Sequence, residues 1–177
     1  MPEHAAETVA YISAGSSIEP QKHLAAAVAM LQERVSVLAI STVYRTPAIG
    51  RPRDPDFLNC VFQVKTSLPP RALKFDVLRD TEARLGRRKS PDKYSPRKID
   101  LDLILYGEEI IDEPDLKIPH PDLSRWFVRV PLLELSPALD VPGLGLKLRD
   151  LDFVEAGQRQ GTKVPEFTEW LRRRIEE

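Results

Sequence analysis

The hydrophobic residues of this chain change their spacing in a fixed order, and this order constrains the fold more than any other feature. Alternating or β-branched runs predict strands, and apolar residues three or four apart predict helices. The predicted elements are a strand over 8–14, a helix over 20–35, strands over 36–46 and 57–66, a helix over 70–85 and a strand over 99–106. This βαββαβ order is that of a ferredoxin-like α+β sandwich, in which helices cover one face of an antiparallel sheet.

Two of the predicted strands alternate clearly between apolar and polar residues. The strand over 57–66 then directs Asn59 away from its apolar face, because successive side chains of a strand point to opposite sides. The strand over 99–106 likewise projects Asp100 and Asp102 together from the face opposite its core residues. The residues expected in the core are Leu58, Cys60, Phe62 and Val64 from the first strand, and Ile99, Leu101, Leu103 and Leu105 from the second.

The rest of the chain predicts an extension of this fold. Residues 108–123 indicate a small hairpin with loops, and residues 130–139 a short helix. Within 165–175, three apolar residues at helical spacing predict an amphipathic helix. We therefore expect one domain over 1–154 and a C-terminal polar linker with a short amphipathic helix over 155–177, either docking elsewhere or packing on its own domain. The apolar stripe of that helix is Phe167, Leu171 and Ile175.

Composition narrows the class of protein. With 177 residues, 42% of them hydrophobic and 30% charged, the chain has the make-up of a globular domain. A net charge of -1 favours neither nucleic acid nor an anionic membrane as a partner. The single cysteine, Cys60, excludes an internal disulfide, and neither a secretory signal nor an apolar run of roughly 18–20 residues is evident. These features predict a cytoplasmic protein.

The carboxylates of Asp100 and Asp102 are the most informative candidates for chemistry. Residues two apart in a strand lie roughly 6–7 Å from each other, and two carboxylates so close repel unless a cation lies between them. Magnesium held by one or two carboxylates and by substrate phosphates meets this requirement. A pair of solvated acids on an exposed strand face explains the pattern equally well.

A basic segment over 86–98 precedes these two acids and favours the metal interpretation. Arginines beside a metal-binding pair suit a polyphosphate, because a guanidinium group meets two phosphate oxygens at once. A solvated charge run and a nucleic-acid patch remain alternatives, the latter with Tyr94 as its only aromatic residue. By itself, His120 is more typical of a loop hydrogen bond. The segment's basic residues are Arg87, Arg88, Lys89, Lys93, Arg97 and Lys98, with Asp92 as its only acid.

Together these features resemble the 6-hydroxymethyl-7,8-dihydropterin pyrophosphokinase family over about residues 9–139. The motifs that carry the resemblance are YISAGSS, YRTPAIG, DPDFLN, an E-x-x-x-G-R run from Glu82 to Arg87, SPRKIDLDLILYG and IPHPDLSRWFVRVPLLELSP. The resemblance implies the ferredoxin-like fold, a pyrophosphokinase domain over 1–154, ATP as diphosphate donor, AMP as product and two magnesium ions. The pterin diphosphate would serve folate biosynthesis, and we expect a monomer.

The resemblance also implies roles for individual residues. Asp100 and Asp102 would bind both magnesium ions, and Arg87 and Arg97 would act on the phosphates as catalytic residues. The pterin would lie between Phe57 and Phe127. The implied ATP-binding residues are Arg87, Tyr94, Arg97, Leu103, His120 and Arg125. The implied pterin-binding residues are Thr46, Pro47, Ile49, Phe57, Asn59 and Phe127.

Several positions depart from the family pattern. The chain has Ser17 where asparagine is usual, Tyr94 in place of tryptophan, and one residue fewer than usual between His120 and Arg125. Ser17 and the shortened gap between His120 and Arg125 favour an alternative, a catalytically weakened or repurposed pterin-binding relative. A nucleic-acid-binding ferredoxin-like module is a further alternative, which would need aromatic residues on the sheet and a basic surface.

Overall fold

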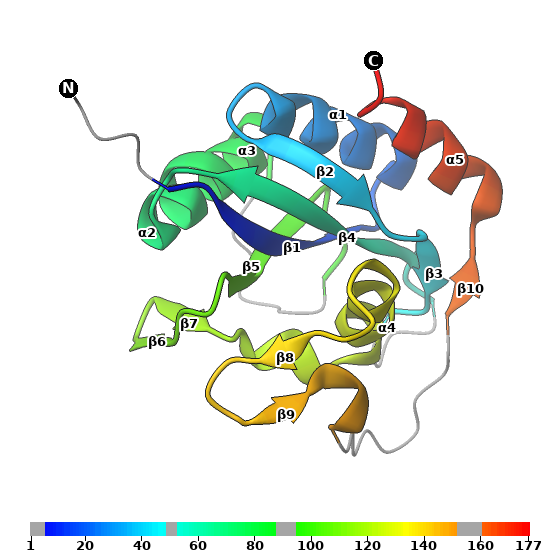
Figure 1. The fold of residues 1–177 in the computed structure, drawn as a ribbon. Coiled ribbons are helices and arrows are strands. Elements are labelled where there is room, and N and C mark those ends of the chain that lie inside the picture. Colours follow the sequence, from blue (N-terminus) through cyan, green and yellow to red (C-terminus); the bar gives the residue numbers. More distant parts are fainter. Residues whose placement is uncertain (1–5, 49–52, 88–94, 152–160) are drawn as a thin grey trace.

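A computed structural model of the chain describes residues 6–48, 53–87, 95–151 and 161–177. One antiparallel sheet crosses the centre of the molecule (Figure 1). Its strands lie in the order β10-β3-β4-β1-β5, and β2 also pairs with β4. These strands are β1 (Thr8–Ser16), β2 (Ser36–Ile40), β3 (Tyr44–Thr46), β4 (Phe57–Thr66), β5 (Asp100–Tyr106) and β10 (Thr162–Lys163).

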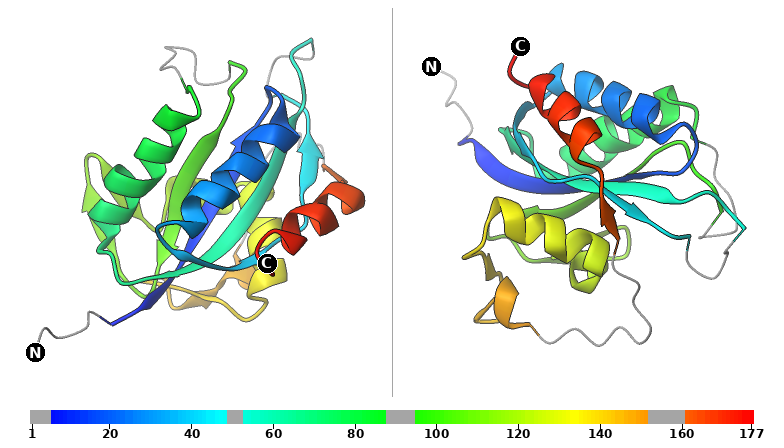
Figure 2. Two further views of the ribbon diagram at one scale, coloured as in Figure 1. Left: turned by 90° about the horizontal axis from the view of Figure 1, so that it is seen from above. Right: turned by 90° about the vertical axis from the view of Figure 1, so that its right-hand side faces the viewer.

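Helices and small hairpins cover both faces of this sheet, with most helices on one side (Figure 2). A continuous helical segment, formed by α2, the π-helical turn η1 and α3, lies beside α1 on that side, and α4 lies on the other. The helices are α1 (Pro20–Gln32), α2 (Pro70–Ala72), η1 (Leu73–Leu78), α3 (Arg79–Arg84), α4 (Trp126–Leu135) and α5 (Pro165–Arg173). The remaining elements are β6 (Ile111–Glu113), β7 (Leu116–Ile118), η2 (Pro121–Ser124), β8 (Asp140–Val141), β9 (Leu146–Lys147) and η3 (Leu148–Asp150).

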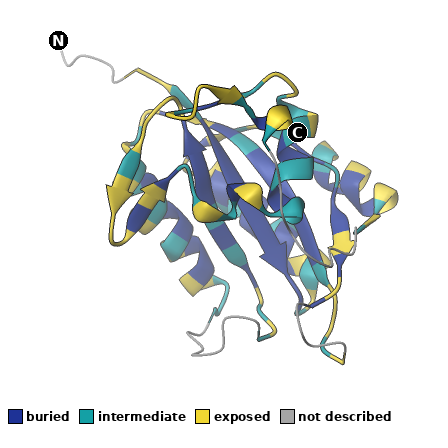
Figure 3. Ribbon diagram, turned by 90° about the horizontal axis from the view of Figure 1, so that it is seen from below, coloured by how far each residue is buried: buried dark blue, intermediate teal, exposed yellow. Residues whose placement is uncertain are grey.

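The strand order and the helical layer confirm the predicted ferredoxin-like fold. Each face of the sheet supports its own hydrophobic core, and the strands between them are buried along most of their length (Figure 3). The first core lies under α1, η1 and α5, and the second under α4. None of the helices in the described segments is long and apolar enough to span a lipid bilayer.

The first strand is longer than the sequence predicts. Gly15 and Ser16 continue β1 and pair with Asn59 and Leu58 of β4, although a glycine followed by serines indicates the end of a strand. A Cβ atom on Gly15 would lie 2.7 Å from Oδ1 of Asn59. The glycine is therefore explained by close approach of a neighbouring side chain, not by a turn.

The predicted strand over 36–46 is wrong in one respect, because it is interrupted after Ile40. The Ser41 hydroxyl accepts a hydrogen bond from the Val61 amide at 2.8 Å, so a side chain replaces a backbone group at this point. The chain then resumes pairing as β3, which brings Thr46 opposite Phe57. A serine hydroxyl thus offers the backbone an alternative hydrogen-bond partner at this position.

A β-bulge in β5 changes which face some residues of the predicted strand over 99–106 occupy. The pairing of β1 with β5 shifts between Tyr11 and Ile12, which face Leu105 and Leu103, so Ile104 is the extra residue. Leu101 and Leu103 pack in the first core as predicted, whereas Leu105 packs in the second. Asp100 and Asp102 precede the bulge, and their predicted common face is unaffected.

The predicted helix over 130–139 also differs in its bounds. Arg125 has extended backbone angles and α4 begins immediately after it, so Pro131 lies inside the helix. The helix ends before Ser136 because the following residue, Pro137, disfavours helical angles at Ser136. The predicted hairpin over 108–123 is present as β6 and β7.

The C-terminal segment packs on the sheet. Strand β10 pairs with β3, and α5 places Phe167 and Leu171 in the first core with Ile175 packed against it. Burying two such side chains stabilises the fold by about 1.5–3 kcal/mol each. The predicted stripe is therefore the face that attaches this helix to the rest of the chain.

Candidate active site

The candidate site lies across three adjacent strands. Asn59 of β4, Gly15 of β1 and Asp100 of β5 are direct neighbours in the register, so they form one row across the sheet. Neighbouring strands lie about 4.8 Å apart, which separates Asn59 from Asp100 by roughly 10 Å. Oδ1 of Asn59 lies over Gly15, 2.7 Å from where a Cβ atom would be, so the glycine makes room for the Asn59 side chain. The row thus sets an amide and a carboxylate on the same face of the sheet.

Asp100 is held by two arginines. Its Oδ1 accepts a hydrogen bond from Nη1 of Arg87 at 2.9 Å, and its Oδ2 from Nη1 of Arg97 at 3.2 Å. The serine that departs from the family pattern supports the second contact, because the Ser17 hydroxyl accepts a hydrogen bond from the Arg97 amide at 3.0 Å. The amide of Ser17 also donates to the Arg97 carbonyl at 2.9 Å.

Asp102 has weaker ionic contacts. Its Oδ1 lies 3.7 Å from Nη2 of Arg79 and 3.9 Å from Nε2 of His120. Burial, together with the neighbouring charge of Asp100, raises the pKa of Asp102 to about 7, although Arg79 opposes this shift. A carboxylate in this condition fits a cation ligand, because an added cation would stabilise its charged form.

Glu82 of α3 supports both aspartates from the edge of the sheet. Its carboxylate is 3% exposed, accepts a hydrogen bond from the Leu101 amide at 3.0 Å, and contacts Arg79 and Arg87. Burial raises the pKa of Glu82, and the two arginines oppose that effect. Glu82 thus satisfies an edge amide of β5 and positions two guanidinium groups beside the aspartates.

The His120 side chain accepts a hydrogen bond in this arrangement. Its Nδ1 accepts a hydrogen bond from the Asp122 amide at 2.9 Å, so a neutral ring carries its proton on Nε2, which faces Asp102. Burial lowers the pKa of His120 and favours that neutral form. One ligand atom each from Asp102, His120 and Asp122 could lie within 4.8 Å of one another. Because Nε2 carries the proton, His120 is better suited to donate a hydrogen bond to a phosphate oxygen than to bind a metal ion.

A buried polar pair lies at the opposite end of the row. Nδ2 of Asn59 donates a hydrogen bond to the Thr46 hydroxyl at 2.6 Å, and both residues are buried. The half-buried ring of Phe57 lies close to Gly15. An amide and a hydroxyl beside an aromatic ring suit a flat heterocycle with polar edges.

The structure does not gather all of the predicted site residues. Leu103 is buried in the first core, on the face opposite Asp102, and Phe127 packs against the second core. Arg125 precedes α4, with its Nε 3.8 Å from Asp122 and thus near His120. Pro47 is exposed beyond β3. The predictions for Ile49 and Tyr94 fall outside the described residues.

Three residues of the site were not singled out from the sequence, namely Arg79, Glu82 and Asp122. Glu82 belongs to the E-x-x-x-G-R run, but a glutamate on a helix is usually solvated, and only its burial reveals its role. The spacing of Arg79 three residues before Glu82 was a possible signal, because residues at this separation are neighbours on a helix.

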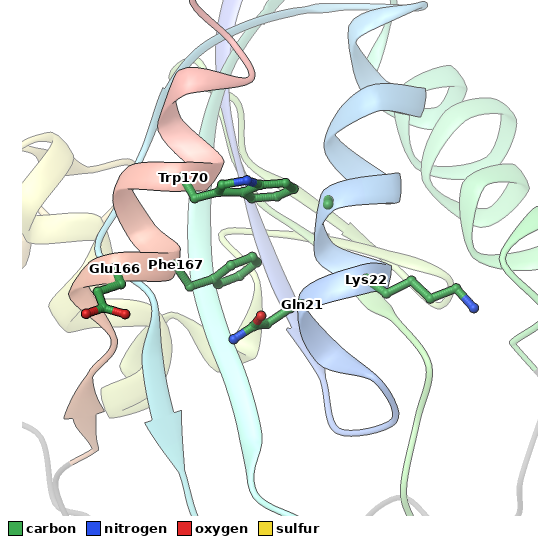
Figure 4. Close-up of a pocket in the computed structure, with 6 residues that line it drawn as sticks. Gln21, Lys22, Glu166, Phe167 and Trp170 are labelled. Carbon is green, nitrogen blue, oxygen red and sulfur yellow. The ribbon is translucent and has the colours of Figure 1, made fainter.

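A separate hollow of about 350 Å³ lies between α1 and α5 (Figure 4). Phe167 and Trp170 stack on one side of it, with ring centroids 5.8 Å apart, and Gln21 and Lys22 lie on the other. None of the predicted site residues lines this hollow.

Comparisons with known proteins agree with this geometry. The model of the 7,8-dihydro-6-hydroxymethylpterin-pyrophosphokinase (HPPK) family matches residues 11–137. A 2-amino-4-hydroxy-6-hydroxymethyldihydropteridine pyrophosphokinase of Aquifex aeolicus is 39% identical over 129 residues, which cover 72% of this chain and 79% of that protein. The Bacillus subtilis protein of the same name is 37% identical, over 75% of this chain and 80% of its own length.

Solved structures show the same fold. A Plasmodium falciparum HPPK-DHPS structure superposes with a TM-score of 0.61 at 12% identity, covering 83% of this chain and 43% of that one. The chain thus spans less than half of that protein. The fold and site, with these relatives, define an ATP-dependent diphosphotransferase. More particularly, the chain belongs to the 7,8-dihydro-6-hydroxymethylpterin-pyrophosphokinase family.

The raised pKa of Asp102 predicts a pH-dependent effect of Asp102→Asn on stability. The folded state holds this proton more tightly than the unfolded state, whose aspartate titrates near 3.8, so stability is lost as the pH rises from about 4 to about 7. Asparagine carries no such charge. We expect Asp102→Asn to be more stable than the parent protein by about 1–3 kcal/mol at pH 8 without metal.

Thermal unfolding in EDTA at several pH values measures this difference. The advantage of Asp102→Asn should shrink as the pH falls towards 4. Asp112→Asn, which changes an exposed carboxylate, is the matched control and should show no such trend. A difference that stays constant between pH 4 and pH 8 would contradict the assignment of the titration to Asp102.

Proposed function

We propose that this chain transfers a diphosphate from ATP to the hydroxymethyl group of 6-hydroxymethyl-7,8-dihydropterin, with AMP as the second product. The observation that carries the proposal is the row formed by Asn59, Gly15 and Asp100, because it sets a heterocycle-binding amide roughly 10 Å from a metal-binding carboxylate. This span suits a small bicyclic substrate that directs its hydroxymethyl group towards a bound polyphosphate.

In the proposed reaction, the substrate hydroxyl oxygen bonds to the β-phosphorus of ATP and the bond from that phosphorus to the bridging α–β oxygen breaks. The hydroxyl proton is released, and AMP leaves with the bridging oxygen. Two magnesium ions held by Asp100 and Asp102 would neutralise phosphate charge when bound. Arg87 and Arg97 would bind the phosphates, since both guanidinium groups already face Asp100.

His120 and Arg125 would add phosphate contacts from the segment before α4. Since Nδ1 of His120 accepts from the Asp122 amide, a neutral ring would donate to phosphate through Nε2. Arg125 lies near His120 because both side chains approach Asp122. At the other end, Asn59 and Thr46 would bind the polar edge of the pterin, with Phe57 and Phe127 on its faces. Tyr94, Pro47 and Ile49 complete the proposed site residues, whereas the side chain of Leu103 is buried in the first core and is left out of the site. We propose that the protein acts as a monomer.

The alternative of a weakened relative has less support. Ser17 exchanges two hydrogen bonds with the backbone of Arg97, so the serine retains a structural role beside the site. The shortened segment between His120 and Arg125 still leaves Arg125 next to Asp122. These contacts favour an active transferase.

The test is AMP release from ATP by the purified protein, with and without 6-hydroxymethyl-7,8-dihydropterin, at saturating magnesium. Pterin-dependent AMP formation is the expected result. A folded protein that binds the pterin but releases no AMP would be the weakened relative. Salt-sensitive RNA binding without ATP binding would instead indicate the nucleic-acid module.

Replacing Arg97 by alanine should reduce turnover by about 100-fold and nucleotide affinity by much less. The reason is that a cation aimed at the transferring phosphates gains most in the transition state, where charge develops on them. Single-turnover kinetics and equilibrium binding of an ATP analogue measure the two effects separately. Arg84→Ala, at the exposed end of α3, is the control. Equal losses of binding and turnover would contradict this role for Arg97.

A further inference from the structure

Arg79 occupies an unusual place beside the candidate metal ligands. It follows the π-helical turn η1 directly and is the first residue of α3. Its Nη1 donates hydrogen bonds to the Glu82 carboxylate at 2.5 Å and to the Leu101 carbonyl at 2.8 Å. Its Nη2 lies 3.7 Å from Oδ1 of Asp102. One nitrogen thus anchors the guanidinium group, and the other faces the aspartate.

The two aspartates differ in their cationic neighbours. Asp100 contacts Arg87 and Arg97, whereas the ionic contacts of Asp102 among the described residues are with Arg79 and His120. Arg79 is permanently charged, because a guanidinium group does not lose its proton in proteins. Among the described residues, it is therefore the permanent positive charge in contact with Asp102.

The cluster brings three acidic residues together with three arginines. Glu82, Asp100 and Asp102 contribute three carboxylates, and three arginines contact them. A free divalent cation that approaches Asp102 meets the Arg79 charge at close range, and the repulsion between like charges weakens its binding. A metal ion already bound to ATP arrives with the negative charge of the nucleotide phosphates, which offsets the repulsion from Arg79.

We propose that Arg79 is the resident counter-ion of Asp102, which keeps the aspartate pair from binding free divalent cations and gives way to a metal–nucleotide complex. The inference rests on the proposed function in that it takes Asp100 and Asp102 as metal ligands. Arg79 is a positioning residue here. Because the guanidinium group is planar, it would pivot as a whole about its Nη1 contacts to Glu82 and Leu101, so that Nη2 moves away from the arriving metal.

The test measures Mn²⁺ binding by electron paramagnetic resonance, with and without a non-hydrolysable ATP analogue. We expect Arg79→Gln to bind free Mn²⁺ about 10-fold more tightly than the parent protein, because one positive charge is removed near the site. Arg79→Lys should retain the weak binding of the parent. Arg84→Gln, which removes an exposed arginine from the same helix, should also leave free Mn²⁺ binding unchanged.

Several outcomes would overturn the proposal. Unchanged free Mn²⁺ affinity in Arg79→Gln is one, and an equal gain in Arg79→Lys is another, since the charge would then not be the cause. Arg79→Met, which retains much of the aliphatic packing, replaces Arg79→Gln if that variant does not fold. Arg79→Gln could gain affinity for free Mn²⁺ while the parent protein releases no AMP in the presence of the pterin. That result would support the counter-ion role and reject the proposed transferase. Failure to bind Mn²⁺ even with nucleotide would reject the metal site and the counter-ion role together.

Discussion

Replacing Asp100 and Asp102 together by alanine is expected to reduce pterin-dependent AMP formation by at least about 1,000-fold. Positioned positive charge supplies most of the stabilisation in phosphoryl transfer, and loss of one strong electrostatic contact alone typically costs about 100–1,000-fold. The double variant removes both proposed metal ligands. It also removes the Asp100 carboxylate that Arg87 and Arg97 share, although Arg87 keeps its contact with Glu82.

The measurement is initial AMP release at saturating ATP and pterin over a range of magnesium concentrations. A double variant that exchanges the exposed acids Asp112 and Asp140 for alanine is the control, because it makes the same change in net charge. That control should retain full activity. Activity within 10-fold of the parent in the Asp100 and Asp102 variant would remove the metal pair from the proposed reaction.

Pterin binding by the double variant shows whether it has lost only the metal site or the whole fold. The polar pair of Asn59 and Thr46 belongs to β4 and β3, on the other side of β1 from the aspartates. We therefore expect the double variant to bind the pterin with nearly the affinity of the parent protein. This independence follows from the row across the sheet, in which Gly15 separates the two ends.

The period of the strands made much of this site predictable. Alternation along 57–66 and 99–106 placed Asn59 and the two aspartates away from the apolar residues, and the register shows them on one face. The bulge at Ile104 was not predictable, because an extra residue in a continuous apolar run leaves no mark in the pattern. It changes the position of Leu105 but not that of the acids before it.

Contacts between elements that are far apart in the chain could not be predicted from the sequence. The alternation of β5 does not reveal that its outer edge lies against α3, where Glu82 and Arg79 bond to the backbone of Leu101. The break at Ser41 has a similar cause, since it depends on the amide of Val61 in the neighbouring strand. Periodicity reports which face a residue occupies, whereas these contacts depend on which element lies beside a strand edge.

Glu82→Ala is expected to destabilise the fold by about 3–5 kcal/mol, because removal of one member of a buried ion pair leaves its neighbours uncompensated. The Leu101 amide loses its acceptor at the edge of β5, and Arg79 and Arg87 lose a shared carboxylate. Urea unfolding at pH 7 measures the loss. Glu33→Ala, which removes an exposed glutamate 3.9 Å from Arg84, should change stability by less than about 1 kcal/mol.

Glu82→Gln separates the hydrogen bond of Glu82 from its charge. The amide oxygen of glutamine can still accept from Leu101, so this variant should lose clearly less stability than Glu82→Ala. Burial already disfavours the charged form of Glu82, which limits the cost of removing that charge. Equal losses in both variants would show that the arginines, not the edge amide, depend on this carboxylate. Losses below about 1 kcal/mol in both would contradict a supporting role for Glu82 at the site.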